Sequence, residues 1–160
     1  MNKRKAAQHK TVLTYGTYDL FHVGHLRLFK RLKDLGDRLI VGVSTDEFNA
    51  VKGKRTIVPF PQRAEIIESL SCVDLVIAES SWSQKVDDIK KYGVDIFAMG
   101  DDWRGKFDDL EAYCEVRYLP RTACVSSTDV KHALESIHKL SPKELAIQYE
   151  ILHRLLADLK

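Results

Sequence analysis

The sequence predicts an α/β protein, a Rossmann-like doubly wound parallel sheet with a C-terminal helical extension. Short β-rich runs alternate with amphipathic helical segments over residues 11–119, and this alternation favours parallel strands joined by helices. The run 94–99 is apolar throughout, as expected of a parallel strand that is buried on both faces. Beyond Pro120 the pattern is helical only, which predicts the extension.

The first unit is a strand, a helix and a second strand. The β-rich runs 11–15 and 39–44 flank a segment, 23–35, whose apolar residues recur at 26, 29, 32 and 35. We expect Gly36 to close this helix in the way that a C-terminal glycine commonly does.

The following segments continue the alternation. Ser44, Thr45 and Asp46 can cap a short helix that runs to Val51, and the polar loop 52–61 follows. The remaining expected elements are a helix over 63–70, a strand over 74–78, a helix over 82–92 stopped by Gly93, strands over 94–99 and 115–119, and helices over 126–137 and 143–160. Right-handed crossovers then place the loops after the strands along one edge, where ligands usually bind.

The length of 160 residues, 44% of them hydrophobic, suits one globular domain with its own core. We expect a basic, disordered tail over 1–10, a domain over 11–138 and an amphipathic helix over 139–160. Apolar residues in the last helix alternate spacings of four and three, the seam of a short coiled coil. They are Leu145, Tyr149, Leu152, Leu156 and Leu159. This stripe can pack on its own domain or join a second copy, and we expect a homodimer.

The composition argues against several classes of protein. Lysine and arginine total 25 against 23 acidic residues, so the net charge of +2 provides no surface-wide field for nucleic acid. No segment approaches the roughly 20 apolar residues that a membrane-spanning helix needs. The three cysteines have no CxxC spacing. We therefore expect a cytoplasmic protein that binds no nucleic acid and has no membrane span.

The segment from His22 to His25 is the first candidate for chemistry. The two imidazoles are three residues apart on the first turn of a helix, so they face the same way. A helix N-terminus offers N–H groups and partial positive charge, and Gly24 lets a phosphate approach the backbone. Capping histidines and a metal pair are the alternatives, although no third ligand has an obvious spacing and Asp19 alone could approach. We favour phosphate.

Two further groups follow strands. Lys52, Lys54 and Arg55 lie on a loop made flexible by Gly53, which either closes over phosphates or is an ordinary solvated basic loop. After the buried strand come two acids and an indole, Asp101, Asp102 and Trp103, which packing alone explains poorly.

A second helix N-terminus repeats the arrangement of the first. Arg121 and Thr122 precede Ser126 and Ser127, so an arginine and several hydroxyls gather at the start of a predicted helix. Simple N-capping by a serine is the alternative. Capping and phosphate binding are compatible, because a bound phosphate can take the remaining N–H groups.

Residues 16–25 read Gly-Thr-Tyr-Asp-Leu-Phe-His-Val-Gly-His and match the G-T-F-D-x-x-H-x-G-H opening of cytidylyltransferases. Segments 44–49, 82–85, 99–108 and 118–122 also resemble bacterial glycerol-3-phosphate cytidylyltransferases, so the resemblance covers about residues 11 to 135. The most restrictive segment is 99–108, which follows the pattern M-G-D-D-W-x-G-K-F-D.

The resemblance implies that CTP and a small phosphorylated alcohol, sn-glycerol 3-phosphate, react by in-line attack on the α-phosphate to give CDP-glycerol and pyrophosphate. It implies catalytic functions for His22, His25, Lys52 and Arg121. It implies nucleotide contacts for Tyr15, Gly16, Thr17, Tyr18, Asp19, Gly24, Gly100, Asp102, Trp103, Arg121, Thr122, Ser126 and Ser127. It implies substrate contacts for Lys52, Lys54, Arg63 and Asp19. We expect Mg²⁺ to be carried mainly by the CTP phosphates, with no metal site on the protein.

Two other functions stay open. Segments 62–65 and 72–74 also look like heptose-phosphate adenylyltransferases, and the chain departs from the cytidylyltransferase pattern at Ser71, Ala123 and Cys124. An adenylyltransferase acting on a sugar phosphate or a similar phosphomonoester is therefore the rival enzyme. A rival of another class is a non-catalytic nucleotide-binding or assembly module whose C-terminal helices recruit a partner.

Overall fold

The computed structural model describes residues 9–122 and, beyond them, residues 131, 141, 143, 146, 147 and 149–151. The chain divides into two compact units, 1–125 and 126–160, and the first contains the sheet. The predicted helices over 126–137 and 143–160, with most of their apolar stripe, lie outside the described residues, as does nearly all of the tail 1–10. The predicted domain boundaries therefore stay predictions.

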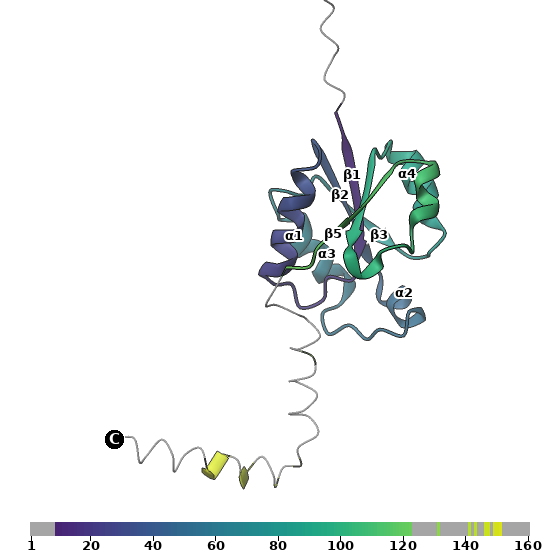
Figure 1. The fold of residues 1–160 in the computed structure, drawn as a ribbon. Coiled ribbons are helices and arrows are strands. Elements are labelled where there is room, and N and C mark those ends of the chain that lie inside the picture. Colours follow the sequence, from purple (N-terminus) through teal and green to yellow (C-terminus); the bar gives the residue numbers. More distant parts are fainter. Residues whose placement is uncertain are drawn as a thin grey trace, which may run out of the picture. The chain divides into compact units, whose positions relative to one another are not determined.

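A five-stranded parallel sheet forms the centre of the first unit, in the order β3-β2-β1-β4-β5 (Figure 1). Its strands are β1 (Thr11–Gly16), β2 (Arg38–Ser44), β3 (Leu75–Glu79), β4 (Ile96–Gly100) and β5 (Glu115–Leu119). The chain builds outward from β1 to β3 and then returns to add β4 on the other side of β1. This reversal makes the crevice between β1 and β4 a topological switch point, and the predicted doubly wound sheet is confirmed.

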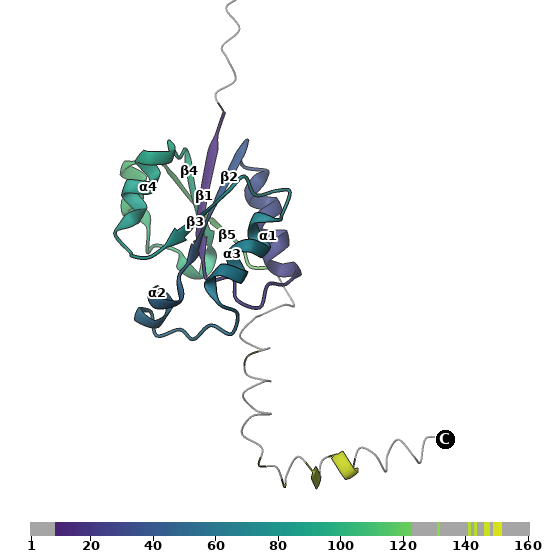
Figure 2. The same cartoon turned by 180° about the vertical axis from the view of Figure 1, so that it is seen from behind.

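Helices cover both faces of the sheet. The helices α1 (Val23–Lys33) and α3 (Phe60–Glu68) lie on one face and α4 (Gln84–Tyr92) on the other, as both views show (Figure 1, Figure 2). Phe29 and Ile67 belong to one core cluster, and Ile89 belongs to the other. Neighbouring residues of β1 enter different clusters, Val12 the first and Leu13 the second, because side chains alternate along a strand.

The carboxyl ends of the strands meet at one edge, and the short elements gather there. The helix α2 (Asp46–Val51) follows β2 at this edge (Figure 1), and the 3₁₀ turns η1 (Asp101–Trp103) and η2 (Asp108–Ala112) follow β4. The predicted cap of α2 is confirmed, because the Thr45 hydroxyl accepts a hydrogen bond from the Phe48 N–H at 3.1 Å. Among the described helices, none is both long and apolar enough to cross a membrane.

The ends of several elements differ by a few residues from the sequence prediction, and two of these differences have a clear physical reason. The helix α1 ends at Lys33, and Gly36 does not close it with a left-handed turn. A Cβ on Gly36 would instead lie 2.6 Å from the Lys10 carbonyl oxygen, so glycine is needed for a close approach of two backbone segments. The helix α3 begins at Phe60 and not at Arg63, because Pro61 fits a first turn that needs no N–H from it.

Candidate active site

The two histidines of the first turn of α1 are fixed by backbone hydrogen bonds. His22 is the N-cap, and its Nδ1 accepts from the Gly24 N–H at 3.1 Å. His25 Nδ1 accepts from the His22 N–H at 3.4 Å, and the two rings stack with centroids 3.9 Å apart. A neutral imidazole whose Nδ1 accepts must carry its proton on Nε2. The histidines therefore do cap the helix, and the same bonds set their tautomer as Nε2–H donors.

Both imidazoles are neutral at physiological pH. Burial and, to a smaller extent, the neighbouring His22 together lower the pKa of His25 to about 4, while Asp19 opposes the shift. Burial also lowers the pKa of His22. Neutral imidazoles with fixed tautomers are directional hydrogen-bond donors.

Asp19 holds the loop that leads to the histidines. It lies between Tyr18 and Leu20, which have φ values of 52° and 49°, a left-handed conformation that costs non-glycine residues about 1–2 kcal/mol each. Its carboxylate is 3% exposed and accepts backbone N–H bonds from Leu20 at 3.1 Å, Ile57 at 2.8 Å and Val58 at 2.9 Å. Asp19 thus ties the strained loop to the basic loop after α2. Its contact with a ligand stays a prediction.

Tyr18 packs against His25 in the first turn of α1. Its ring packs edge-on against His25 and Phe29, with centroids 5.6 Å and 4.9 Å away. The side chain is buried, and within the described part of the chain its hydroxyl has no hydrogen-bond partner. The ring therefore supports the orientation of His25, whereas the hydroxyl contributes no bond of its own.

Arg63 is 1% exposed and binds the protein itself. It donates to the carbonyl oxygens of Val58 (2.8 Å), Thr17 (2.6 Å) and Ser44 (2.9 Å) and to the Asp46 carboxylate (2.7 Å). A guanidinium has five N–H donors, so these four bonds occupy most of them. Arg63 joins the ends of β1 and β2, and its predicted contact with a substrate phosphate stays untested.

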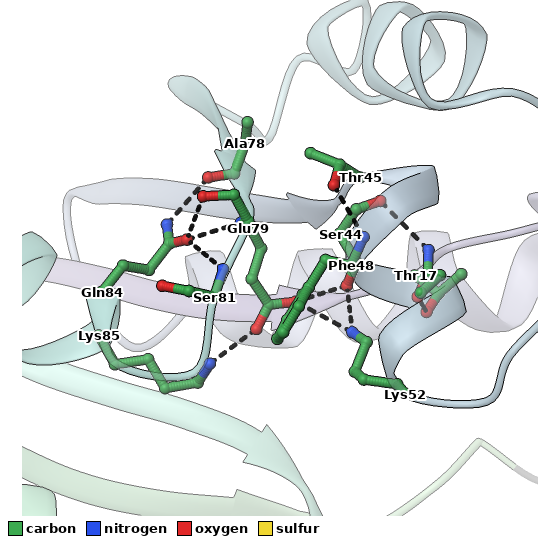
Figure 3. A network of polar contacts seen from close by, with 12 residues as sticks. Thr17, Ser44, Thr45, Phe48, Lys52, Ala78, Glu79, Ser81, Gln84 and Lys85 are labelled. Carbon is green, nitrogen blue, oxygen red and sulfur yellow. Dashed lines mark hydrogen bonds and ion pairs between the residues drawn. The ribbon is translucent and has the colours of Figure 1, made fainter.

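A buried carboxylate between two lysines forms the second polar centre of the site (Figure 3). Glu79, at the end of β3, is 2% exposed and accepts from Lys85 Nζ at 2.7 Å and from Lys52 Nζ at 3.3 Å. The Ser44 hydroxyl also binds Glu79 and accepts from Lys52 at 2.7 Å. Burial lowers the pKa of the Lys52 ammonium, and the ion pair with Glu79 opposes this shift. The ion pair thus favours the charged form of Lys52.

Lys52 was predicted from the sequence as a site residue, whereas Glu79 and Lys85 were not. Glu79 ends a strand at the edge of a parallel sheet where ligands usually bind, and this position is the feature of the sequence that could have identified it as a site residue. Lys85 comes from α4, a different element, and it meets Glu79 through the tertiary fold.

A pocket of about 370 Å³ lies beside this network. Its lining residues are Lys52, Lys54, Trp82, Trp103, Lys106 and Phe107. The structure thus brings together the two predicted loop lysines and the predicted Trp103, and it adds Trp82, Lys106 and Phe107. This lysine pocket combines ammonium groups with aromatic walls.

The remaining predicted residues lie around these two centres. Tyr15 is buried, donates its hydroxyl to Asp88 at 2.6 Å and places its ring 4.5 Å from Lys85 Nζ. The Thr17 hydroxyl donates to Asn49 at 2.8 Å, so it anchors the end of β1 to α2. Gly16 lies between them at the end of β1.

Gly100 and Asp102 are close neighbours after β4. A Cβ on Gly100 would lie 2.5 Å from Asp102 Oδ1, so glycine allows the carboxylate to fold back over the strand end. Asp102 is exposed and lies in η1 beside the crevice between β1 and β4. This position suits the predicted contact with a nucleotide.

The segment after β5 lies against α1. Arg31 donates to the Pro120 carbonyl oxygen at 2.9 Å and to the Thr122 hydroxyl at 3.3 Å. Arg121 and Thr122 are thereby held beside the helix that carries the histidines. Arg31 was not predicted from the sequence, because there it resembles any basic residue near a helix end. The predicted Ser126 and Ser127 lie outside the described residues.

A resident metal would need ligands that gather in one place. Among the described residues, no group of three or more histidine, cysteine or acidic side chains is arranged to hold a metal ion.

Three comparisons with known proteins bear on this site. A family model described as "Cytidylyltransferase-like" matches residues 13–133. The glycerol-3-phosphate cytidylyltransferase of Bacillus spizizenii is 52% identical over 128 residues, covering 80% of this chain and 99% of that protein. The protein of the same name from Staphylococcus aureus is 52% identical over 125 residues, covering 78% and 95%.

Among solved structures, a lipopolysaccharide core biosynthesis protein from Thermoplasma volcanium superposes with a TM-score of 0.61 at 24% identity. The match covers 72% of this chain and 99% of that one. At this identity the likeness concerns the fold alone.

Proposed function

The chain belongs to the cytidylyltransferase-like family, and we propose that it joins CTP to sn-glycerol 3-phosphate to give CDP-glycerol and pyrophosphate. The observation that carries the reaction type is the stacked pair of neutral Nε2–H donors at the N-terminus of α1. The identity of the acceptor comes from the names of the relatives.

The reaction needs positioning and charge stabilisation more than proton transfer. An oxygen of the acceptor phosphate attacks the α-phosphorus of CTP, a P–O bond forms, and the bond to the β-phosphate oxygen breaks as pyrophosphate leaves. A phosphomonoester is already largely dianionic near pH 7, since its second pKa is about 6. The nucleophile therefore needs no general base, which agrees with two histidines that are neutral donors.

His22 and His25 bind the oxygens of the α-phosphate in this proposal. Negative charge builds there during attack, and preorganised donors act most strongly where charge develops. The N-terminus of α1 adds its partial positive charge behind them. Asp19 and Tyr18 act as positioning residues, because they hold the loop and the ring of His25.

The lysine pocket receives the acceptor phosphate. Lys52 and Lys54 line it, and Glu79 orients Lys52 toward Ser44 and the end of β2. A phosphate dianion is attracted by several ammonium groups at once, and the tryptophans leave room for the carbon chain beside them. Lys52 then also contacts the phosphate that is being transferred.

CTP lies across the crevice between β1 and β4, with cytidine near Gly100 and Asp102 and its phosphates near α1 and Arg121. Open α/β sheets bind nucleotides at this kind of reversal in strand order. The substrate is the magnesium complex of CTP, because triphosphates normally carry Mg²⁺. We propose further that the enzyme is cytoplasmic and a homodimer, and light scattering on the purified full chain tests the second point.

The test of the reaction is a measurement of pyrophosphate release for each pairing of a nucleotide with a phosphorylated alcohol. We expect turnover with CTP and glycerol 3-phosphate, and little with ATP. Turnover with ATP and a sugar phosphate, with glycerol 3-phosphate inert under CTP, would favour the rival adenylyltransferase. Nucleotide binding without pyrophosphate release from any pair would favour a non-catalytic module.

A further inference from the structure

The aromatic rings of the lysine pocket are covered by the protein's own cations. Trp103 has Lys54 Nζ at 5.4 Å and Lys106 Nζ at 5.1 Å from its ring centroid. Trp82 has Lys52 Nζ at 5.6 Å and Lys85 Nζ at 4.9 Å.

The third ring, that of Phe107, has Lys85 Nζ at 5.6 Å from its centroid. Lys85 also donates to Glu79 at 2.7 Å (Figure 3), so its ammonium group is held in place near the Trp82 and Phe107 rings. Every aromatic ring that lines the pocket thus has at least one ammonium group within cation–π distance.

Aromatic pockets usually attract cations. The face of a ring carries negative potential, and cages of such faces recognise quaternary and methylated ammonium groups when the cation lies within about 6 Å of the centroid. Here lysine side chains already occupy those positions. A positively charged group on a ligand would therefore find no ring face free to bind it, and the lysine ammonium groups would repel it.

The charges around the pocket also disfavour a positively charged ligand. Three of its six lining residues are lysines. The buried carboxylate of Glu79 is bound by Lys52 and Lys85, whereas Lys54 and Lys106 have no carboxylate partner among the residues that the structure describes. The charges of Lys54 and Lys106 therefore act on whatever enters the pocket.

We propose that this lysine-covered aromatic wall selects phosphorylated alcohols that carry no positive charge and rejects phosphorylated amino alcohols. Lys54 and Lys106 are the specificity-determining residues. The inference rests on the proposed function in one respect, namely that the pocket receives the acceptor.

Two ligands that differ only in their terminal group test how a positive charge on the ligand affects binding. The probes are 2-hydroxyethyl phosphate and 2-aminoethyl phosphate, which have the same length and differ in a hydroxyl against an ammonium group. Trp82 and Trp103 are the two tryptophans of the chain, and both line the pocket, so intrinsic fluorescence reports binding there without CTP. Since each exposed like-charge pair changes affinity by about two- to fivefold, we expect the hydroxyl ligand to bind about tenfold tighter.

Substitution of an exposed lysine should reduce this preference. Lys106→Gln should reduce the ratio of the affinity for 2-hydroxyethyl phosphate to that for 2-aminoethyl phosphate by about two- to fivefold, and Lys106→Glu should reduce this ratio further. Lys54→Gln is the second variant and should act in the same direction. Lys90→Gln is the matched control, because Lys90 Nζ lies 5.1 Å from the Tyr113 ring in a similar pair outside the pocket lining, and we expect the ratio to be unchanged.

Three results would overturn the inference: equal affinities in the wild-type protein, an unchanged ratio in both Lys106→Gln and Lys54→Gln, or no fluorescence response to either ligand. Turnover with CTP is measured separately. Failure to release pyrophosphate with a retained fluorescence preference would overturn the proposed function and leave this inference standing. Turnover with glycerol 3-phosphate but no preference between the matched ligands would overturn this inference alone.

Discussion

The histidine turn at the start of α1 and the lysine pocket beside β3 both offer positive potential at the same edge of the sheet, but they do so by different means. The histidines are neutral, and backbone groups fix which nitrogen carries the proton. The pocket uses formal charges, which Glu79 and the aromatic rings hold in place. Directional neutral donors suit a short-lived transition state, whereas several charges suit the capture of a dianion.

The two regions also differ in how they are assembled. His22 and His25 are three residues apart, so the pitch of one helix brings them together. The lysine pocket takes residues from the end of α2 and the loop after it, from the segment between β3 and α4, and from the segment after β4. A change in the first region should therefore affect chemistry locally, and a change in the second should affect binding and the stability of the fold together.

The largest effect is expected from His25→Ala. We expect kcat to fall by about 100- to 1000-fold with little change in CTP affinity, because one preorganised donor to the developing charge is lost. Steady-state kinetics and equilibrium CTP binding on the folded variant measure this. His9→Ala removes an exposed imidazole and is the control. Normal turnover in a folded His25→Ala protein would contradict the assignment of the histidine turn.

Glu79→Gln should damage the lysine pocket while the histidine turn stays intact. The substitution keeps the shape and leaves Lys52 and Lys85 without their shared carboxylate, and breaking a buried ion pair costs about 3–5 kcal/mol of unfolding free energy. We expect a higher KM for the acceptor with a smaller change in kcat. Urea unfolding and kinetics measure both quantities.

Glu65→Gln, on the exposed surface of α3, is the control for that substitution. Lys85→Met in the Glu79→Gln background should recover part of the lost stability, because it removes one of the two uncompensated charges. Equal stability of Glu79→Gln and the wild-type protein would show that the ion pairs contribute little.

Lowering the pH should destabilise the folded protein through protonation of His25 in the histidine turn. The folded protein protonates His25 at a pKa of about 4, whereas an imidazole in the unfolded chain has an ordinary value of 6.5. Protons therefore favour unfolding as the pH falls from 6.5 toward 4, and the loss of unfolding free energy should reach about 2–3 kcal/mol. Urea titrations of wild type and His25→Gln across this window measure the difference, which isolates His25 from the carboxylates. Parallel pH profiles of the two proteins would contradict the lowered pKa.

The smallest effect is expected from Tyr18→Phe. The buried hydroxyl has no partner in the described part of the chain, so its removal should leave unfolding free energy unchanged or raise it by up to about 1 kcal/mol. The ring that packs on His25 remains, and turnover should be unchanged. Tyr18→Leu, which removes the ring, should lower kcat. Differential scanning calorimetry and kinetics distinguish the hydroxyl from the ring.

Local patterns in the sequence predicted those features that depend on neighbouring residues. A cap of α2 within residues 44–46 and the end of α4 at Gly93 were predicted correctly, because each depends on a few adjacent residues; the structure identifies Thr45 as the cap and a left-handed Gly93. Gly36 was predicted to close α1 and is instead required by the Lys10 carbonyl, which comes from the segment before β1. The reason for a glycine can thus lie in a distant segment of chain.

By itself, the sequence determined the alternation of strands and helices, the shared helix face of His22 and His25, and the family motifs. These depend on helical and strand periodicity and on short spacings. The tertiary structure alone decided that Arg63 is buried, that Glu79 joins Lys52 to Lys85, and that lysines cover the rings of the pocket. Glu79 and Lys52 are 27 positions apart in the chain, and strand order, which periodicity does not encode, brings them into contact.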